Sequence, residues 1–195
     1  MRVDAQRNHD HILEVARELF ASEGVRVQID EIARAAGVGV GTVHRHFPTK
    51  EHLLEAVLVW SCEPIVDALE QALKGDDPGA GLESFLLRVV EYQSDQKALA
   101  EEMREMHDRS PELTEIKALI SSRMAELVVR AQDAGQIRSD VGPGDLRLLL
   151  AGLAQTASAS GAIFSPEDKV RFVRIMLDGL CTPAPTPLPG DAPAL

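Results

Sequence analysis

Two short helical patterns lie between Ile29 and Lys50, in the sequence IDEIARAAGVGVGTVHRHFPTK. Apolar residues of the first pattern recur at the spacing of one helix face, at Ile29, Ile32, Ala33 and Ala36. The second pattern follows Gly39 and can bury Val40, Val43 and Phe47 on one face. Gly37 between them can adopt the positive φ that ends a helix. Together they predict a helix-turn-helix at about residues 29–47.

The outer surface of the second short helix is expected to carry only neutral or positive hydrogen-bond donors. Its side chains are those of Gly41, Thr42, Arg45 and His46, with His44 on the flank. Between Ile32 and Lys50 the chain has three cations, two histidines and no acidic residue. This surface therefore suggests contact with DNA, where the cations that face phosphates determine docking.

Helical periodicity continues through the rest of the chain and predicts an all-α protein of about nine helices. A first helix is expected from about Asp10 to Glu23, and a long helix begins after the N-cap Thr49. Pro64 should kink or break that long helix near Trp60, because proline removes a backbone donor. Residues 74–81 (KGDDPGAG) read as a linker.

Further helices are predicted at about 82–93, 95–109 and 110–134, where Ser110 and Pro111 form a start signal. Two apolar stripes follow, separated by a Ser165 capping signal. We divide the chain into a DNA-binding domain at 8–60, a helical ligand-binding and dimerisation domain at 61–181, and a Pro-rich disordered tail at 182–195.

Composition refines this assignment. The net charge of −11 comes from residues 51–195, with 13 basic and 24 acidic residues, whereas residues 1–50 carry seven of each. An acidic body attached to a neutral head is compatible with DNA binding. Two cysteines in different elements imply no disulfide framework, and a cytoplasmic protein is expected. We predict no membrane span, metal site or cofactor.

The N-terminal third resembles the DNA-binding head of the TetR family of transcriptional regulators. The resemblance rests on AGV at 36–38 within IA-x-x-AGV, on GT at 41–42 and HF at 46–47, on Lys50 and on Leu53–Leu54. Upstream, residues 12–25 are similar to the family's first helix. The resemblance implies DNA contacts from Gln28, Val40, Gly41, Thr42, His44, Arg45, His46 and Lys50.

Two positions depart from the family pattern. Gln28 stands where the family commonly has a capping Thr or Ser, and His44 stands where it usually has Tyr. A histidine donates more strongly when protonated, so contact at His44 can depend on pH. Val40 and Gly41 offer only apolar contact or close approach, so DNA shape should contribute to sequence preference.

The resemblance also implies a dimer and a ligand pocket in the remaining two thirds of the chain. The predicted dimer interface comprises Leu146, Leu149, Leu150, Leu153, Ala157, Val173, Met176, Leu177 and Leu180. The same stripes also fit an intramolecular core. Candidate pocket residues for a small apolar or amphipathic ligand, which also fit an ordinary core, are Phe85, Val89, Tyr92, Met103, His107 and Met124.

We therefore expect a homodimeric repressor that binds a palindromic double-stranded DNA operator and leaves it when a small molecule binds. Two alternatives remain open. One is a ligand-independent DNA-binding dimer whose body only sets the spacing of the heads. The other is an enzyme with an incidental DNA-binding head, although the body shows no nucleophile elbow or spaced acid–base pair.

Overall fold

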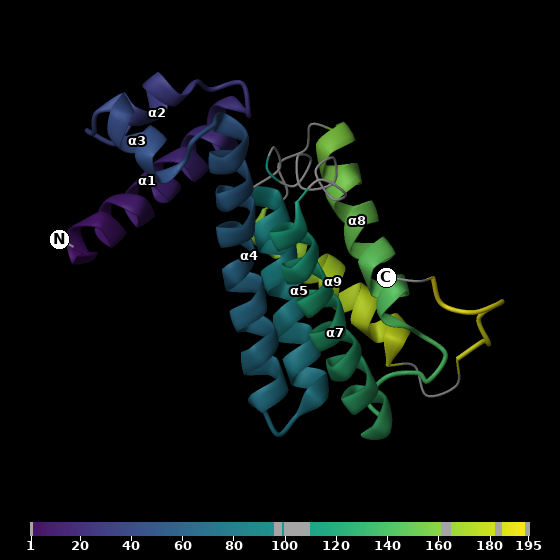
Figure 1. The fold of residues 1–195 in the computed structure, drawn as a ribbon. Coiled ribbons are helices and arrows are strands. Elements are labelled where there is room, and N and C mark those ends of the chain that lie inside the picture. Colours follow the sequence, from purple (N-terminus) through teal and green to yellow (C-terminus); the bar gives the residue numbers. More distant parts are fainter. Residues whose placement is uncertain (1, 96–98, 100–109, 161–164, 182–184, 194–195) are drawn as a thin grey trace. The chain divides into compact units, whose positions relative to one another are not determined.

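The computed structural model describes residues 2–95, 99, 110–160, 165–181 and 185–193. These residues form eight α-helices and no strand (Figure 1), which confirms the all-α prediction. In chain order the helices are α1 (Arg2–Glu23), α2 (Ile29–Ala35), α3 (Val40–His46), α4 (Lys50–Lys74), α5 (Pro78–Asp95), α7 (Pro111–Asp133), α8 (Pro143–Ser160) and α9 (Pro166–Leu180). The helix predicted at 95–109 lies almost entirely outside the described residues.

The chain forms two compact units. Unit 1 comprises Met1–Glu63 and Gln96–Ile116, and unit 2 comprises Pro64–Asp95 and Lys117–Leu195. The long helix α4 contributes its first half to unit 1 and its second half to unit 2. Each unit has a hydrophobic core of its own, as expected for two folded parts.

Unit 1 includes α1, α2, α3, the first half of α4 and the first turns of α7. Its core holds Ile12 and Phe20 of α1 and Ile32 of α2, none of which is exposed to solvent. Small Ala33 is also buried, where α2 packs against its neighbours. Gly37 ends the first short helix with a φ of +66°, the conformation that the sequence pattern required.

Pro64 does not break the long helix, because α4 runs from Lys50 to Lys74 with Pro64 inside it. The other predicted outcome, a kink near Trp60, stays a prediction. Side chains on both sides of the proline anchor the helix: Leu58 and Leu69 are completely buried, and Cys62 and Ile65 nearly so. We attribute the continuity to this packing, which outweighs the loss of one backbone hydrogen bond. The first helix also starts earlier than predicted, at Arg2.

The expected linker at 74–81 is shorter in the structure, because α5 begins at Pro78. Asp77 caps this helix: its carboxylate accepts a hydrogen bond from the Ala80 N–H at 3.0 Å. Both predicted capping signals further along are confirmed. Ser110 Oγ accepts from the Leu113 N–H at 3.0 Å, and Ser165 Oγ accepts from the Asp168 N–H at 3.1 Å.

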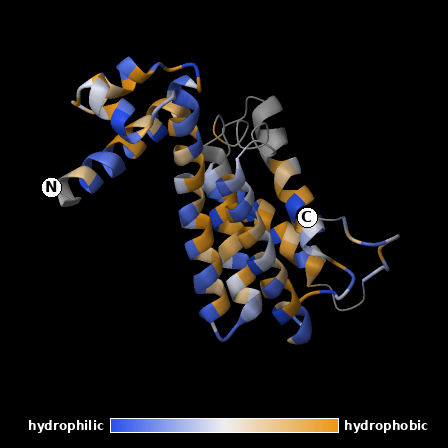
Figure 2. Ribbon diagram, in the orientation of Figure 1, coloured by the Kyte–Doolittle hydropathy of each residue, from blue (hydrophilic) through white to orange (hydrophobic). Residues whose placement is uncertain are grey.

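Unit 2 packs α5 against both α8 and α9. Figure 2 shows hydrophobic and hydrophilic residues sharing these helices, which is the pattern of helices with one face in a core. Leu82, Leu86, Leu127 and Leu146 have no exposed surface and form the centre of this core. The Arg130 guanidinium donates to the carbonyls of Leu73 and Gly75, and so satisfies acceptors at the end of α4.

Candidate nucleic-acid interface

Helix α3 is fixed in unit 1 by two buried side chains. Val43 has no exposed surface and Phe47, directly after the helix, has 3%. With these residues inward, Gly41, His44 and Arg45 are exposed on the opposite side of the helix. The structure thus presents outward most of the surface that the periodicity of residues 40–47 predicted.

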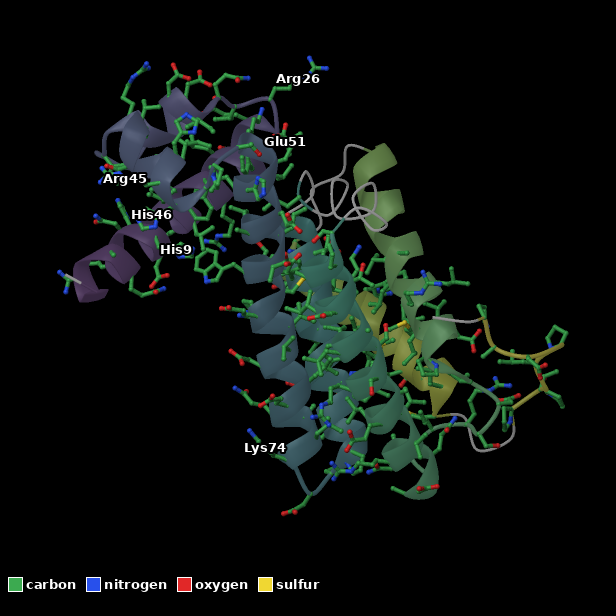
Figure 3. All side chains as sticks on the ribbon, viewed as in Figure 1. His9, Arg26, Arg45, His46, Glu51 and Lys74 are labelled. Atoms are coloured by element: carbon green, nitrogen blue, oxygen red, sulfur yellow. The ribbon has the colours of Figure 1, made fainter. Side chains whose placement is uncertain are left out.

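Arg45 lies along its own helix. Its Nε donates to the Gly41 carbonyl at 3.1 Å, and its Nη2 donates to Thr42 Oγ1 at 3.2 Å. Both bonds are exposed, so they can be exchanged for contacts with a ligand at little cost. Thr42 and Arg45 therefore form one group of hydrogen-bond donors on the outer face of α3, where Figure 3 labels Arg45.

His46 lies at the end of α3 in an aromatic cluster that the sequence analysis missed. Its ring centroid is 5.7 Å from that of His9 on α1, in an edge-to-face arrangement (Figure 3). The His9 ring also lies 5.0 Å from Phe47, so α1 supports the end of α3 through ring contacts. His9 precedes the predicted start of the first helix. It lies 37 positions before His46 in the sequence, so no local pattern indicated that the two rings would meet.

The N-terminal half of α3 has small or apolar side chains. Val40 is 42% exposed, although the sequence analysis placed it on the buried face. A Cβ added to Gly41 would meet no atom within 4 Å, so the missing side chain leaves open surface. The backbone at Gly41 is therefore accessible to any surface that fits against α3.

The two positions that depart from the family pattern use other local contacts. The Gln28 side-chain amide donates to the Arg26 carbonyl at 2.7 Å, while the Glu31 carboxylate accepts from the Gln28 N–H at 2.7 Å. Glu31 thus supplies capping at the start of α2. His44 is exposed, and its Nδ1 lies 3.3 Å from the Pro48 carbonyl oxygen.

Helix α4 begins at Lys50, four residues after the end of α3. Thr49 Oγ1 accepts from the His52 N–H at 3.3 Å, which confirms Thr49 as the N-cap. Lys50 is half-buried in the first turn. Hydrogen bonds from its own backbone N–H and from Thr49 lower the pKa of Glu51. This carboxylate therefore stays ionised and partly offsets the positive helix terminus.

The nine predicted interface residues divide into two groups. Six are buried in the core of the same unit: Leu146, Leu150, Leu153, Val173, Leu177 and Leu180. Leu149 is 43% exposed, Met176 is half-buried, and the side chain of Ala157 is outside the described residues.

Helices α8 and α9 nevertheless each carry exposed apolar side chains. They are Leu148 and Leu149 on α8 and Phe172 and Ile175 on α9, of which Ile175 is the most exposed at 61%. Phe172, Ile175 and Gly179 fall at i, i+3 and i+7, so they share one face of α9.

Three of the predicted pocket residues lie in the core of unit 2. Phe85 is 2% exposed, Val89 9% and Met124 5%. Tyr92 packs at the edge of this core. Met103 and His107 lie outside the described residues.

Among the residues that the structure describes, no three or more His, Cys, Asp or Glu side chains lie together so as to hold a metal ion. No helix among these residues has the length and apolar character of a membrane span.

Comparison with known proteins gives the same picture for both units. The family model of bacterial regulatory proteins of the tetR family matches residues 12–57. The model described as the C-terminal domain of SbtR-like transcriptional regulators matches residues 77–182. The two matches include α2, α3, α8 and α9.

Two solved structures are similar over nearly the whole chain. A TetR transcriptional regulator from Streptomyces coelicolor is 32% identical, with a TM-score of 0.69, and covers 90% of this chain and 99% of its own. A TetR regulatory protein from Mycobacterium vanbaalenii is 35% identical, with a TM-score of 0.70, and covers 93% and 99%.

A curated relative matches over a shorter stretch. An HTH-type transcriptional regulator of Staphylococcus aureus (strain USA300) is 32% identical over 103 residues, which is 51% of this chain and 55% of that protein. The match thus spans about half of the curated relative. All these relatives are described as transcriptional regulators and none as an enzyme. The chain belongs to the TetR family of transcriptional regulators.

Proposed function

We propose that this chain is a homodimeric transcriptional repressor that places α3 in the major groove of a palindromic operator. One observation carries the proposal: burial of Val43 and Phe47 turns Arg45 outward while Gly41 leaves the backbone open. The major groove of B-DNA admits a helix, and arginine can bind guanine through two hydrogen bonds there. Repression, rather than activation, follows what is usual in the family.

The proposed DNA contacts differ in kind. Arg45 is the candidate for reading a base edge, because its guanidinium has five donors and only exposed bonds to exchange. Thr42, His46 and Lys50 are proposed to donate to phosphates, which positions α3 without reading sequence. Gln28 and His44 are proposed as further backbone contacts, and Val40 as an apolar contact.

We propose that the exposed apolar side chains of α8 and α9 join two copies. Leu149 is 43% exposed and Ile175 is 61% exposed, and Met176, next to Ile175 in the chain, is half-buried. The buried members of the predicted set would support these side chains from inside the same unit. A dimer is required because one helix of seven residues reads few base pairs, and two heads about 34 Å apart would reach successive major grooves.

Selection of bound fragments from random DNA tests the proposal. The full chain should enrich a palindrome, and its affinity should fall steeply as the salt concentration rises, because counterions leave the phosphates. A wild-type chain that enriches no sequence, or binds the selected DNA equally well from 50 to 300 mM salt, would contradict phosphate docking. A single, non-palindromic half-site would contradict only the dimer.

Release by a small apolar or amphipathic molecule is the finer part of the proposal. Phe85, Val89 and Met124 lie together on unit 2 helices, and flexible methionine suits an adaptable apolar site. The same burial favours the second candidate, a ligand-independent dimer, because these residues already pack in a continuous core. Screening small molecules for release of the selected operator distinguishes the two. The proposed activity on an operator implies a cytoplasmic protein.

A further inference from the structure

The C-terminal segment at residues 185–193 contacts the turn between α7 and α8. The carbonyl oxygen of Thr186 accepts a hydrogen bond from Arg138 Nη2 at 2.6 Å. Two residues later, the Leu188 N–H donates to Asp140 Oδ2 at 3.0 Å. The segment therefore engages both members of one arginine–aspartate pair through its backbone, so the contacts do not depend on the identity of its side chains.

The receiving turn is held in place by contacts that do not involve the segment. Arg138 Nε and Nη2 donate to the two carboxylate oxygens of Asp140 at 2.5 and 2.8 Å. The Arg138 N–H donates to the Leu180 carbonyl at the end of α9, at 2.8 Å. From α7, the Gln132 amide donates to the carbonyls of Arg138 and Val141 at 3.1 and 2.8 Å. The turn therefore has supports of its own, apart from the docked segment.

The charge of Arg138 keeps the Asp140 carboxylate ionised and able to accept hydrogen bonds. The Arg138 guanidinium, followed by the Leu188 N–H, lowers the pKa of Asp140 far below its usual range. Asp140 therefore remains an ionised acceptor throughout the neutral range. A hydrogen bond to a charged acceptor is stronger than one between neutral groups.

Gly142 of the turn and Gly144 at the start of α8 leave the space that the segment fills. A Cβ built on Gly142 would lie 2.5 Å from the Ala192 Cβ, and one built on Gly144 would overlap the Pro193 carbonyl group. Neither glycine has a positive φ, so backbone conformation does not explain the missing side chains. Gly135 shows the opposite case, with a φ of +67° and open space around it.

We infer that residues 138–144 form a docking site for the chain's own segment 185–193, which straps the end of α9 to the turn that precedes α8. The occupant that this site fits is an extended, proline-containing peptide. Prolines at 185, 187 and 189 limit the unfolded conformations of the segment and so reduce the entropy lost on docking. Only Thr186 and Leu188 interrupt this run, and one supplies the carbonyl and the other the N–H that the turn uses.

Composition alone suggested a disordered tail, and amide hydrogen exchange of the full chain decides between the two. A docked Leu188 amide should exchange at least tenfold more slowly than the same amide in a free peptide of residues 182–195. Exchange at the free-peptide rate overturns the strap. Protection that disappears on dilution would mean that the segment docks on a second copy, and would overturn docking within one chain.

Gly144→Val should remove the protection of Leu188, because the added side chain occupies the space of Pro193. Gly152→Val is the matched control: it makes the same substitution on the same helix, where a Cβ meets no atom within 4 Å. Its Leu188 amide should stay protected. Unchanged protection in Gly144→Val would overturn the inference.

A second pair of variants leaves the helices untouched, in case Gly144→Val fails to fold. Leu188→Pro removes the donor to Asp140, whereas Leu188→Ala keeps the donor and loses only a side chain that is 41% exposed. Exchange of the amides of Gly190, Asp191 and Ala192 should rise at least tenfold in the proline variant alone. Equal exchange in both variants would show that the Leu188 N–H does not hold the segment. None of these readouts requires DNA binding.

Discussion

Replacing Arg45 with alanine tests directly whether α3 faces DNA. In the free protein its only described side-chain bonds are to Gly41 and Thr42 of its own helix, and both are exposed. A substitution at such a surface position changes the free energy of unfolding by about 0.5 kcal/mol at most. Alanine also favours helix, so α3 should remain formed. The stability of the variant therefore stays close to that of the wild type.

The effect on operator affinity should be much larger. A two-bond contact between arginine and guanine contributes about 1–3 kcal/mol of discrimination. A dimer presents two copies of α3, so the total loss is about 2–6 kcal/mol if the two sites act independently. Affinity for the selected operator should accordingly fall at least about 30-fold at fixed salt concentration.

Fluorescence anisotropy with a labelled operator, measured at several salt concentrations, provides the assay. Arg34→Ala is the matched control, because Arg34 is an equally exposed arginine of unit 1 on α2. It removes the same charge without touching α3. If Arg45→Ala and Arg34→Ala both stay folded and their losses of operator affinity agree within twofold, the assignment of Arg45 as a base contact is refuted. A reduced salt dependence in Arg45→Ala would instead indicate a phosphate contact.

Three other changes test the remaining elements. Gly41→Ala should raise helix stability by roughly 0.5–1 kcal/mol, since the added Cβ meets open space, and should weaken operator binding if DNA approaches the backbone there. Thermal melts measure the stability and anisotropy measures the operator affinity. An unchanged affinity would exclude close approach of DNA at Gly41. Ile175→Glu should yield monomers in analytical ultracentrifugation. Val129 is 52% exposed on α7, and the control Val129→Glu should leave the dimer intact. An intact Ile175→Glu dimer would show that the interface lies elsewhere. Ser165→Ala should cost about 1 kcal/mol through loss of the α9 cap and lower the Tm by roughly 2–4 °C, and an unchanged Tm would contradict that role.

Local signals in the sequence were sufficient to place individual helix ends. The start of α9 at Ser165 and the turn at Gly37 each depend on a few neighbouring residues, so their chemistry was visible in the chain. The start of α5 was misjudged although the Asp77–Pro78 signal was present, because the glycines around it favoured a linker. The continuity of α4 through Pro64 could not be read from the sequence, because burial of Leu58 and Leu69 is a property of the folded chain.

Long-range placement could not be obtained in the same way. Helix α8 has leucines at 146, 148, 149, 150 and 153, so apolar residues occur on more than one face. Periodicity cannot say which face meets α5 and which is exposed, and the structure places Leu146 inward and Leu148 outward. The contact between His9 and His46 has the same character, since it joins two helices across 37 positions.

The distribution of charge explains how an acidic chain can be proposed to bind DNA. The net negative charge comes from residues 51–195, while residues 32–50 carry three cations and no acid. Counterion release depends on the cations that face phosphates, and charges beyond about 10 Å are largely screened at 0.1 M salt. Acidic residues away from the groove therefore weaken non-specific association more than specific docking. The ratio of operator to random-DNA affinity should thus fall if exposed acids of unit 2, such as Glu126 and Asp133, are neutralised, with random-DNA affinity changing first.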